Sequence, residues 1–173
     1  MPDRCYVEPH GKRRPLSVQP FHFEDVHPGL VLRSTCAIPM DRDSITAFAR
    51  QFDHHPAHLS EESAKTSMFG VFCASGWHTG AVTMRLISET MPIARGGIGA
   101  GVEKLRWLRP VEAGDALRIE IEILQTRASR SRPDVGVVTY RCTTLNQRDQ
   151  AVQQFTTTVL FPRRDAPTSP SSR

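Results

Sequence analysis

The chain has 173 residues and a mass of 19.4 kDa, enough for one domain with its own hydrophobic core. Hydrophobic residues make up 39% and charged residues 23%, which excludes a disordered or fibrous body, and no hydrophobic run exceeds the four residues Val71 to Ala74, which excludes a membrane-spanning helix. The net charge of +4 comes from residues 1–20 and 162–173, whereas residues 21–161 are neutral and lack the basic excess of a nucleic-acid-binding domain.

The two ends of the chain differ in composition from its middle. Residues 1–20 are polar, basic and contain proline, which predicts a flexible arm, and residues 162–173 are of low complexity, which predicts a disordered tail. We therefore expect a single domain over residues 21–161. The first 20 residues contain no apolar stretch typical of a secretory signal, so we expect a soluble cytoplasmic protein.

The first elements of the predicted domain are a short strand over Val31–Ile38 and an amphipathic helix. Asp41 has the side chain of an N-cap, and apolar residues follow it at positions 45, 48, 49 and 52, the spacing of one helix face. This spacing favours a place in the core for Phe52. Pro56 ends the helical pattern because proline has no backbone N–H and restricts the residue before it.

Two further helices are predicted before the chain changes its period. Ser60 can cap a short helix that ends near Lys65, and Ser75 can cap a longer helix that ends near Thr90. The apolar residues of the longer helix are spread over more than one of its faces: Ala81, Val82, Met84, Leu86 and Ile87. A helix that is apolar on several sides is typically buried.

The second half of the domain reads as four strands. Apolar residues alternate with charged ones over positions 117–123, which is typical of a sheet with one face in water, and extended runs are also predicted over 101–108, 135–145 and 151–161. Proline, glycine, asparagine and aspartate separate these runs. The predicted fold class is α+β, with an antiparallel sheet wrapped around one long buried helix.

Patterns for metal and nucleotide binding are weak in this sequence. His54 and His58 have the spacing of two helix-borne zinc ligands, but Pro56 lies between them and no HExxH motif is present, so we expect no metal site. The glycines of 96–101 lead into a predicted strand and do not form GxGxxG, which argues against a dinucleotide loop. The four cysteines, at 5, 36, 73 and 142, form no metal-binding pair, and we expect reduced thiols.

The best candidate site lies after the first predicted helix, where one carboxylate and three imidazoles follow within six residues. Asp53 and His58 are the acid and base candidates, because a histidine can accept and return a proton near neutral pH. Spacing alone leaves a second interpretation open, in which the histidines bind the free carbonyls of a helix end.

The segment Asp53-x-x-Pro56-x-His58-x5-Ala64 resembles the signature of the MaoC-like, (R)-specific enoyl-CoA hydratases. The resemblance continues in Ala74-Ser-Gly-Trp77-His-Thr-Gly and in residues 102–115, and it covers about residues 23–161. It implies the hotdog fold and the reversible hydration of a 2-enoyl thioester to a 3-hydroxyacyl thioester. It also implies a coenzyme A or acyl-carrier-protein thioester as the substrate, no separate cofactor, and a homodimer.

The resemblance assigns roles to individual residues. Asp53 and His58 would be catalytic, and the N–H of Gly76 would face the thioester oxygen, with tight packing at the helix start as the alternative for this glycine. The neighbours expected around the pair are His55, Ser75 and Trp77. A cluster that could contact the phosphates of coenzyme A, or else form a solvated turn, comprises Arg127, Arg130 and Arg132.

Three residues near the pair depart from the family pattern. Phe52 replaces a usual glycine, His55 an asparagine, and Ser75 a common histidine. If Phe52 does not lie in the core, it would narrow the acyl tunnel. Two other functions stay open, an acyl-CoA thioesterase and a hotdog protein that binds acyl thioesters without catalysis.

Overall fold

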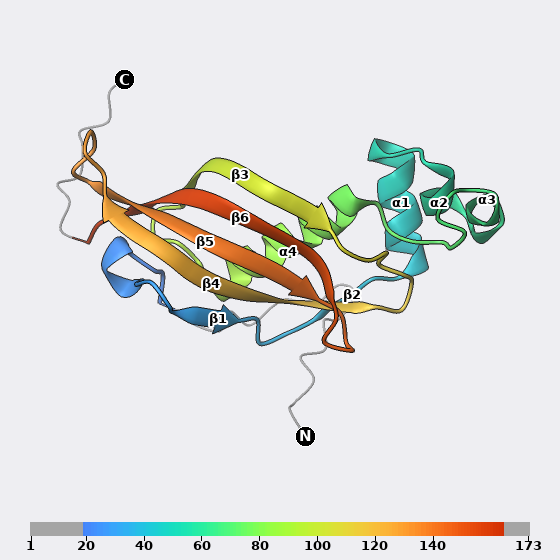
Figure 1. Cartoon of the computed structure of the whole chain (residues 1–173), viewed down its shortest axis with the longest axis horizontal. Helices are drawn as coiled ribbons and strands as arrows, with labels where there is room; N and C mark the ends of the chain where they lie inside the picture. Colours follow the sequence, from blue (N-terminus) through green and yellow to red (C-terminus); the bar gives the residue numbers. More distant parts are fainter. Residues whose placement is uncertain (1–18, 165–173) are drawn as a thin grey trace.

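One antiparallel sheet and a helix that crosses it make up most of the molecule (Figure 1). The computed structural model describes residues 19–164. The predicted arm and tail therefore lie outside the described residues except at 19–20 and 162–164, and the division into arm, domain and tail stays a prediction. The strands are β1 (Val31–Arg33), β2 (Ile38–Pro39), β3 (Ile98–Trp107), β4 (Ala116–Ala128), β5 (Val135–Leu145) and β6 (Ala151–Pro162). The helices are η1 (Phe23–Asp25), α1 (Arg42–Phe52), α2 (Pro56–Leu59), α3 (Glu61–Lys65) and α4 (Gly76–Thr90).

The strands lie in the order β1-β4-β5-β6-β3, and β2 pairs with β4 beside β1. All these pairings are antiparallel. The alternation predicted for β4 is confirmed, because Leu117, Ile119, Ile121 and Ile123 are fully buried while the charged residues between them are only partly buried. The predicted strand Val31–Ile38 is wrong as one element, since β1 and β2 are separated by a bend at Ser34 to Ala37.

The long helix α4 is buried on one side only. Its residues His78, Thr79, Thr83, Leu86 and Ile87 are buried, whereas Ala81, Met84, Arg85 and Ser88 are exposed. The prediction of burial on several faces was therefore wrong for the side turned away from the sheet. The α+β class is confirmed, with the sheet curved along one side of α4 (Figure 1).

The short helices α1, α2 and α3 lie beyond one end of the sheet, around the first turn of α4 (Figure 1). The predicted caps are confirmed: Asp41 Oδ1 accepts a hydrogen bond from Ser44 N (2.7 Å) and Ser60 Oγ accepts one from Ser63 N (3.1 Å). Pro56 does more than end a helical pattern. It is the first residue of α2, where the missing N–H costs nothing, and the Nδ1 atom of His55 caps this turn by accepting from Ala57 N.

Phe52 does not lie in the core. Ile45 and Ala49 of the same stripe are buried, but 69% of Phe52 is exposed. The Phe52 ring lies 5.0 Å from that of Phe48 (between centroids), and Phe48 in turn stacks on His78. Periodicity placed Phe52 on the same face as Ile45 and Ala49, but burial on that face does not continue to the end of the helix.

Candidate active site

Asp53 and His58 are brought together by a sharp change of direction between two helices. Asp53 is the residue that ends α1, and His58 lies on the single turn α2. The distance between Asp53 Oδ2 and His58 Nε2 is 3.7 Å, and the His58 side chain is 7% exposed against 32% for Asp53. A carboxylate open to the solvent thus faces a buried imidazole.

The protonation of the His58 ring follows from its second nitrogen. His58 Nδ1 lies 2.8 Å from the carbonyl oxygen of Cys73. A carbonyl can only accept, so Nδ1 carries the hydrogen and, in the neutral ring, the lone pair is on Nε2, the atom that faces Asp53. This is the arrangement required of a general base.

Ser75 orients the carboxylate of Asp53 through a hydrogen bond. Its Oγ donates a hydrogen bond to Asp53 Oδ2 (2.7 Å) and accepts one from Trp77 N (3.1 Å), so one buried hydroxyl caps α4 and orients the acid. Ser75, one of the three residues expected around Asp53 and His58, thus contacts Asp53 directly. The two residues are 22 positions apart in the sequence.

Gly76 opens α4 beside this pair. Its N–H has no acceptor among residues 19–164, so it is available at the positive end of a 15-residue helix. The tight packing considered for Gly76 is also present, because a Cβ atom here would collide with the ring of Trp107. A donor role and a packing role for this glycine are compatible.

A cavity of about 330 Å³ joins these groups. It is lined by Asp53, His58, Phe69, Cys73, Ala74, Gly76, Trp77, Thr79, Trp107, Leu108, Arg109, Pro110 and Val111. Trp77 lines the cavity. His55 does not line it: His55 caps α2, and its ring lies 5.2 Å from the ring of His58 and 5.6 Å from that of Phe69, so it is a neighbour of the pair outside the cavity. The cavity walls are largely apolar, and their charged groups are few, which suits an acyl chain with one polar reacting group.

Sequence reasoning missed Trp107 and Phe69 as cavity residues. Trp107 lies at the end of β3, inside the segment 102–115 that carries part of the resemblance, but the resemblance gave it no role; Phe69, in the loop after α3, lies in none of the segments that carry it. Cys73 also lines the cavity, but burial, assisted by the negative charge of Glu112, raises the pKa of its thiol to about 11. This thiol is therefore a poor nucleophile.

The arginines proposed for phosphate binding lie far from the pair. Arg127 is at the end of β4, and Arg130 and Arg132 are in the turn before β5, at the opposite end of the sheet from α1 to α3 (Figure 1). Arg132 is also paired with Asp134 (2.8 Å). Within one chain, these arginines do not reach the cavity.

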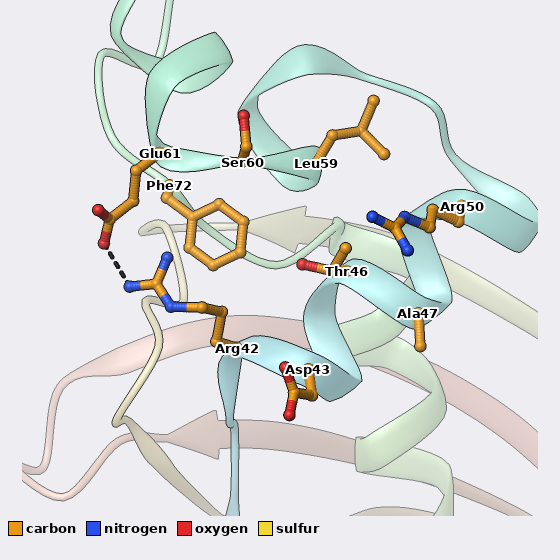
Figure 2. A pocket seen from close by; sticks show the side chains of 9 residues that line it. All are labelled: Arg42, Asp43, Thr46, Ala47, Arg50, Leu59, Ser60, Glu61 and Phe72. Carbon is orange, nitrogen blue, oxygen red and sulfur yellow. Dashed lines mark hydrogen bonds and ion pairs between the residues drawn. The ribbon is translucent and has the colours of Figure 1, made fainter.

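A second hollow of about 420 Å³ lies between α1 and the short helices α2 and α3, and contains neither Asp53 nor His58 (Figure 2). Arg42 forms an ion pair with Glu61 there, and its guanidinium lies 5.1 Å from the centre of the Phe72 ring. Arg50 lies near Leu59 on the other side of the hollow (Figure 2). The charges at this hollow balance, and no acid–base pair opens into it.

The described residues contain neither a metal-binding group nor a membrane-spanning helix. No three His, Cys, Asp or Glu side chains of residues 19–164 are placed to hold an ion, and His54 turns to the Arg50 carbonyl (2.5 Å) instead of joining His58. No helix in this range is long and apolar enough to cross a bilayer.

Comparison with known proteins identifies related chains. The family described as MaoC like domain matches residues 25–146. The uncharacterized Bacillus subtilis protein YdeM is 30% identical over 131 residues, which cover 75% of this chain and 91% of YdeM. The crystal structure of a MaoC-like dehydratase from Rhodospirillum rubrum is 44% identical and superposes with a TM-score of 0.80, covering 84% of this chain and 99% of that one.

Two other structures are more distant. An unliganded (R)-hydratase from Pseudomonas aeruginosa is 25% identical, with a TM-score of 0.65 and coverage of 88% of this chain and 96% of that one. A Mycobacterium tuberculosis protein with a double hotdog fold is 18% identical, with a TM-score of 0.72 and coverage of 87% of this chain and 47% of that one. The last likeness concerns the fold alone, and it confirms the predicted hotdog architecture.

Proposed function

Because this chain belongs to the MaoC-like domain family, we propose that it is a hydratase–dehydratase that adds water reversibly to a 2-enoyl thioester. The observation that carries the proposal is the facing pair in the cavity, the Asp53 carboxylate and the Nε2 lone pair of His58 at 3.7 Å. Hydration needs a base for the water and an acid for the α-carbon, and this pair supplies both.

The proposed reaction uses one water molecule held between the two side chains. His58 Nε2 takes a proton from this water as its oxygen bonds to C3 of the enoyl group, and the pair returns a proton to C2, so that the elements of water add across the double bond from one side. Asp53 stabilises the imidazolium that forms, and Ser75 keeps the carboxylate in place. Dehydration follows the same steps in reverse.

Negative charge moves onto the thioester oxygen when water adds. The free N–H of Gly76, at the start of α4, is the donor that we propose for this oxygen, since a glycine lets the substrate approach the backbone closely. The reaction transfers no electrons and needs no cofactor besides the thioester itself. The substrate would be a thioester of coenzyme A or of an acyl carrier protein, and the active form a homodimer.

Incubation with enoyl-CoA substrates of increasing chain length tests the proposal. The loss of enoyl thioester absorbance and the release of free thiol are followed in the same reaction, with Asp53→Asn as the inactive control. Loss of the double bond without thiol supports a hydratase. Thiol release would instead support a thioesterase, and binding with neither change would support a non-catalytic acyl-thioester protein.

A further inference from the structure

Trp107, the last residue of β3, is bonded to the start of α4. Its indole N–H donates to the carbonyl oxygen of Gly76 (2.9 Å) and to Oε1 of Gln153 (3.0 Å). The ring also packs against the α-carbon of Gly76, leaving no room for a Cβ atom. Trp107 therefore fixes Gly76 by both a hydrogen bond and a close contact.

The anchor of this indole is a polar network buried between α4 and the sheet. The fully buried Gln153 donates from Nε2 to Thr83 Oγ1 (3.2 Å), and Thr83 donates to the Thr79 carbonyl (2.8 Å). Thr144 of β5 lies 2.8 Å from the same Thr83 hydroxyl and has to be the donor there. Because an indole N–H can only donate, the amide oxygen of Gln153 has to face Trp107, so one orientation satisfies every member.

We propose that Trp107 is a positioning residue, which holds the N–H of Gly76 in the place where it meets the thioester oxygen. This inference rests on the proposed function. Donors to a developing negative charge act best when their positions are set before the reaction, and a small displacement costs a large factor in rate. The first turn of α4 has no partner for its Gly76 N–H among residues 19–164, so its position depends on what holds the carbonyl side of this residue.

Trp107→Phe separates the hydrogen bond from the packing, because it keeps a ring against Gly76 and removes the donor. We expect kcat to fall by about 10-fold or more, in line with the loss of oriented stabilisation, with KM within about 2-fold of wild type. Thr144→Val, which breaks the far end of the network, should lower kcat less. Thr139→Val is the matched control. Thr139 lies on β5, like Thr144, and its hydroxyl is 3.1 Å from that of Thr158 on β6, outside the network.

Wild-type kcat in Trp107→Phe would overturn the inference, and so would a raised KM with unchanged kcat, which would make Trp107 a wall of the substrate cavity. If Trp107→Phe does not fold, wild-type kcat in Thr144→Val would overturn the inference in its place. A wild-type protein inactive on every enoyl thioester would refute the proposed function instead. Hydrogen exchange at the Trp77 amide, which donates to Ser75 Oγ in the same turn, then tests the positioning directly, because it should be faster in Trp107→Phe than in Thr139→Val, and equal rates would overturn it.

Discussion

Asp53 and His58 meet because α1 ends at one residue and the short helix α2 carries the other. The Asp53 N–H closes the last turn of α1 by donating to the Ala49 carbonyl, and the Cys73 carbonyl fixes the His58 ring from the opposite side. The backbone of Asp53 and the Nδ1 atom of His58 are thus held by the fold on the side away from the facing pair. Substitution of either side chain should remove chemistry while leaving the fold largely intact.

Asp53→Asn and His58→Ala should each lower turnover by about 10²–10⁴, the usual contribution of a positioned acid or base. Asparagine carries no charge to stabilise a proton on His58, and alanine removes the imidazole that takes the proton from water. Steady-state kinetics on the best enoyl thioester measures the effect. His54→Ala is the control from the same segment, since His54 binds the Arg50 carbonyl and does not line the cavity. Turnover near the wild-type rate in either of the first two variants would remove the pair from the mechanism.

Phe52 should tolerate truncation. With 69% of the residue exposed, Phe52→Ala should cost less than about 1 kcal/mol of unfolding free energy. Ile45→Ala on the same face of α1 should cost about 2–5 kcal/mol, because Ile45 is fully buried. Urea unfolding of both variants gives the comparison. Equal losses would show that the ring of Phe52 is covered in solution.

At the scale of elements, close contacts connect the ends of the sheet to the segments that flank it. The carboxylates of Glu24 and Asp25 in η1 bind Arg163 and Arg164 directly after β6, and Phe23 of η1 packs on β5. The packing on β5 depends on a residue without a side chain, Gly136, because a Cβ atom there would collide with the Phe23 ring.

Gly136→Ala should therefore destabilise the protein by about 1–3 kcal/mol, the usual cost of overpacking. Gly80→Ala should instead stabilise the protein. A Cβ atom at Gly80 would have 3.8 Å to its nearest neighbour, Gln153 Oε1, and alanine inside a helix is favoured over glycine by about 0.5–1 kcal/mol. Thermal unfolding of the two variants should give a lower midpoint for Gly136→Ala and a higher one for Gly80→Ala than for the wild type. A stable Gly136→Ala protein would mean that η1 moves away from β5 at little cost.

Local signals in the sequence predicted the local structure well. The caps Asp41, Ser60 and Ser75 lie where their side chains suggested, since a cap depends on a backbone N–H only two or three residues away. The strand from Val135 to Leu145 was also predicted to the residue. A strand with one face on the core, such as β4 or β5, can be found from its hydrophobic period.

The remainder depends on contacts between distant residues. Ser75 orients Asp53 across 22 positions, and Trp107 reaches Gln153 across 46. Phe52 is exposed although it shares a helix face with the buried Ile45 and Ala49, and the spacing along α1 does not reveal this difference. The Asp53 and His58 pair was found through a resemblance in sequence, because its spacing alone also fits a helix end.

At the scale of the whole molecule, the free edge of the sheet carries an apolar surface. The edge strand β3 is exposed at every position except Leu105, and Ile98 and Val102 lie on it, while Met84 is exposed on α4. A sheet edge with unpaired backbone groups and apolar side chains favours pairing with another chain. Two copies of this chain that paired along β3 would satisfy these backbone groups and cover these side chains.

We expect a mass in solution near twice the 19.4 kDa of the chain. Val102→Lys on the exposed strand β3 should weaken this association, because it places a charge on the joining edge. Val31→Lys on the opposite edge strand, β1, is the control. Light scattering at micromolar concentration measures both. A wild-type protein that is strictly monomeric would refute the predicted homodimer.

Stability should fall in alkaline solution. Burial raises the pKa of Cys73 from 9.0 to about 11 and that of Cys142 to about 12, and it also raises the pKa of Tyr140. Above pH 9 the folded state holds protons that the unfolded chain has released. The contribution of these thiols to the free energy of unfolding is therefore complete below pH 9 and is lost as the pH rises toward 11 and 12. Unfolding midpoints measured from about pH 8 to about pH 11 should decline. Cys142→Ala should flatten the decline, and an identical slope in that variant would exclude the thiol as a cause.

The chain has two tryptophans, and both lie in the wall of the same cavity with their rings 5.3 Å apart. All indole fluorescence of the protein therefore originates beside Asp53 and His58. An acyl thioester that enters the cavity changes the polarity around both fluorophores at once, so its binding can be titrated without a label and without turnover. The tryptophan emission of this protein therefore reports on its candidate active site alone.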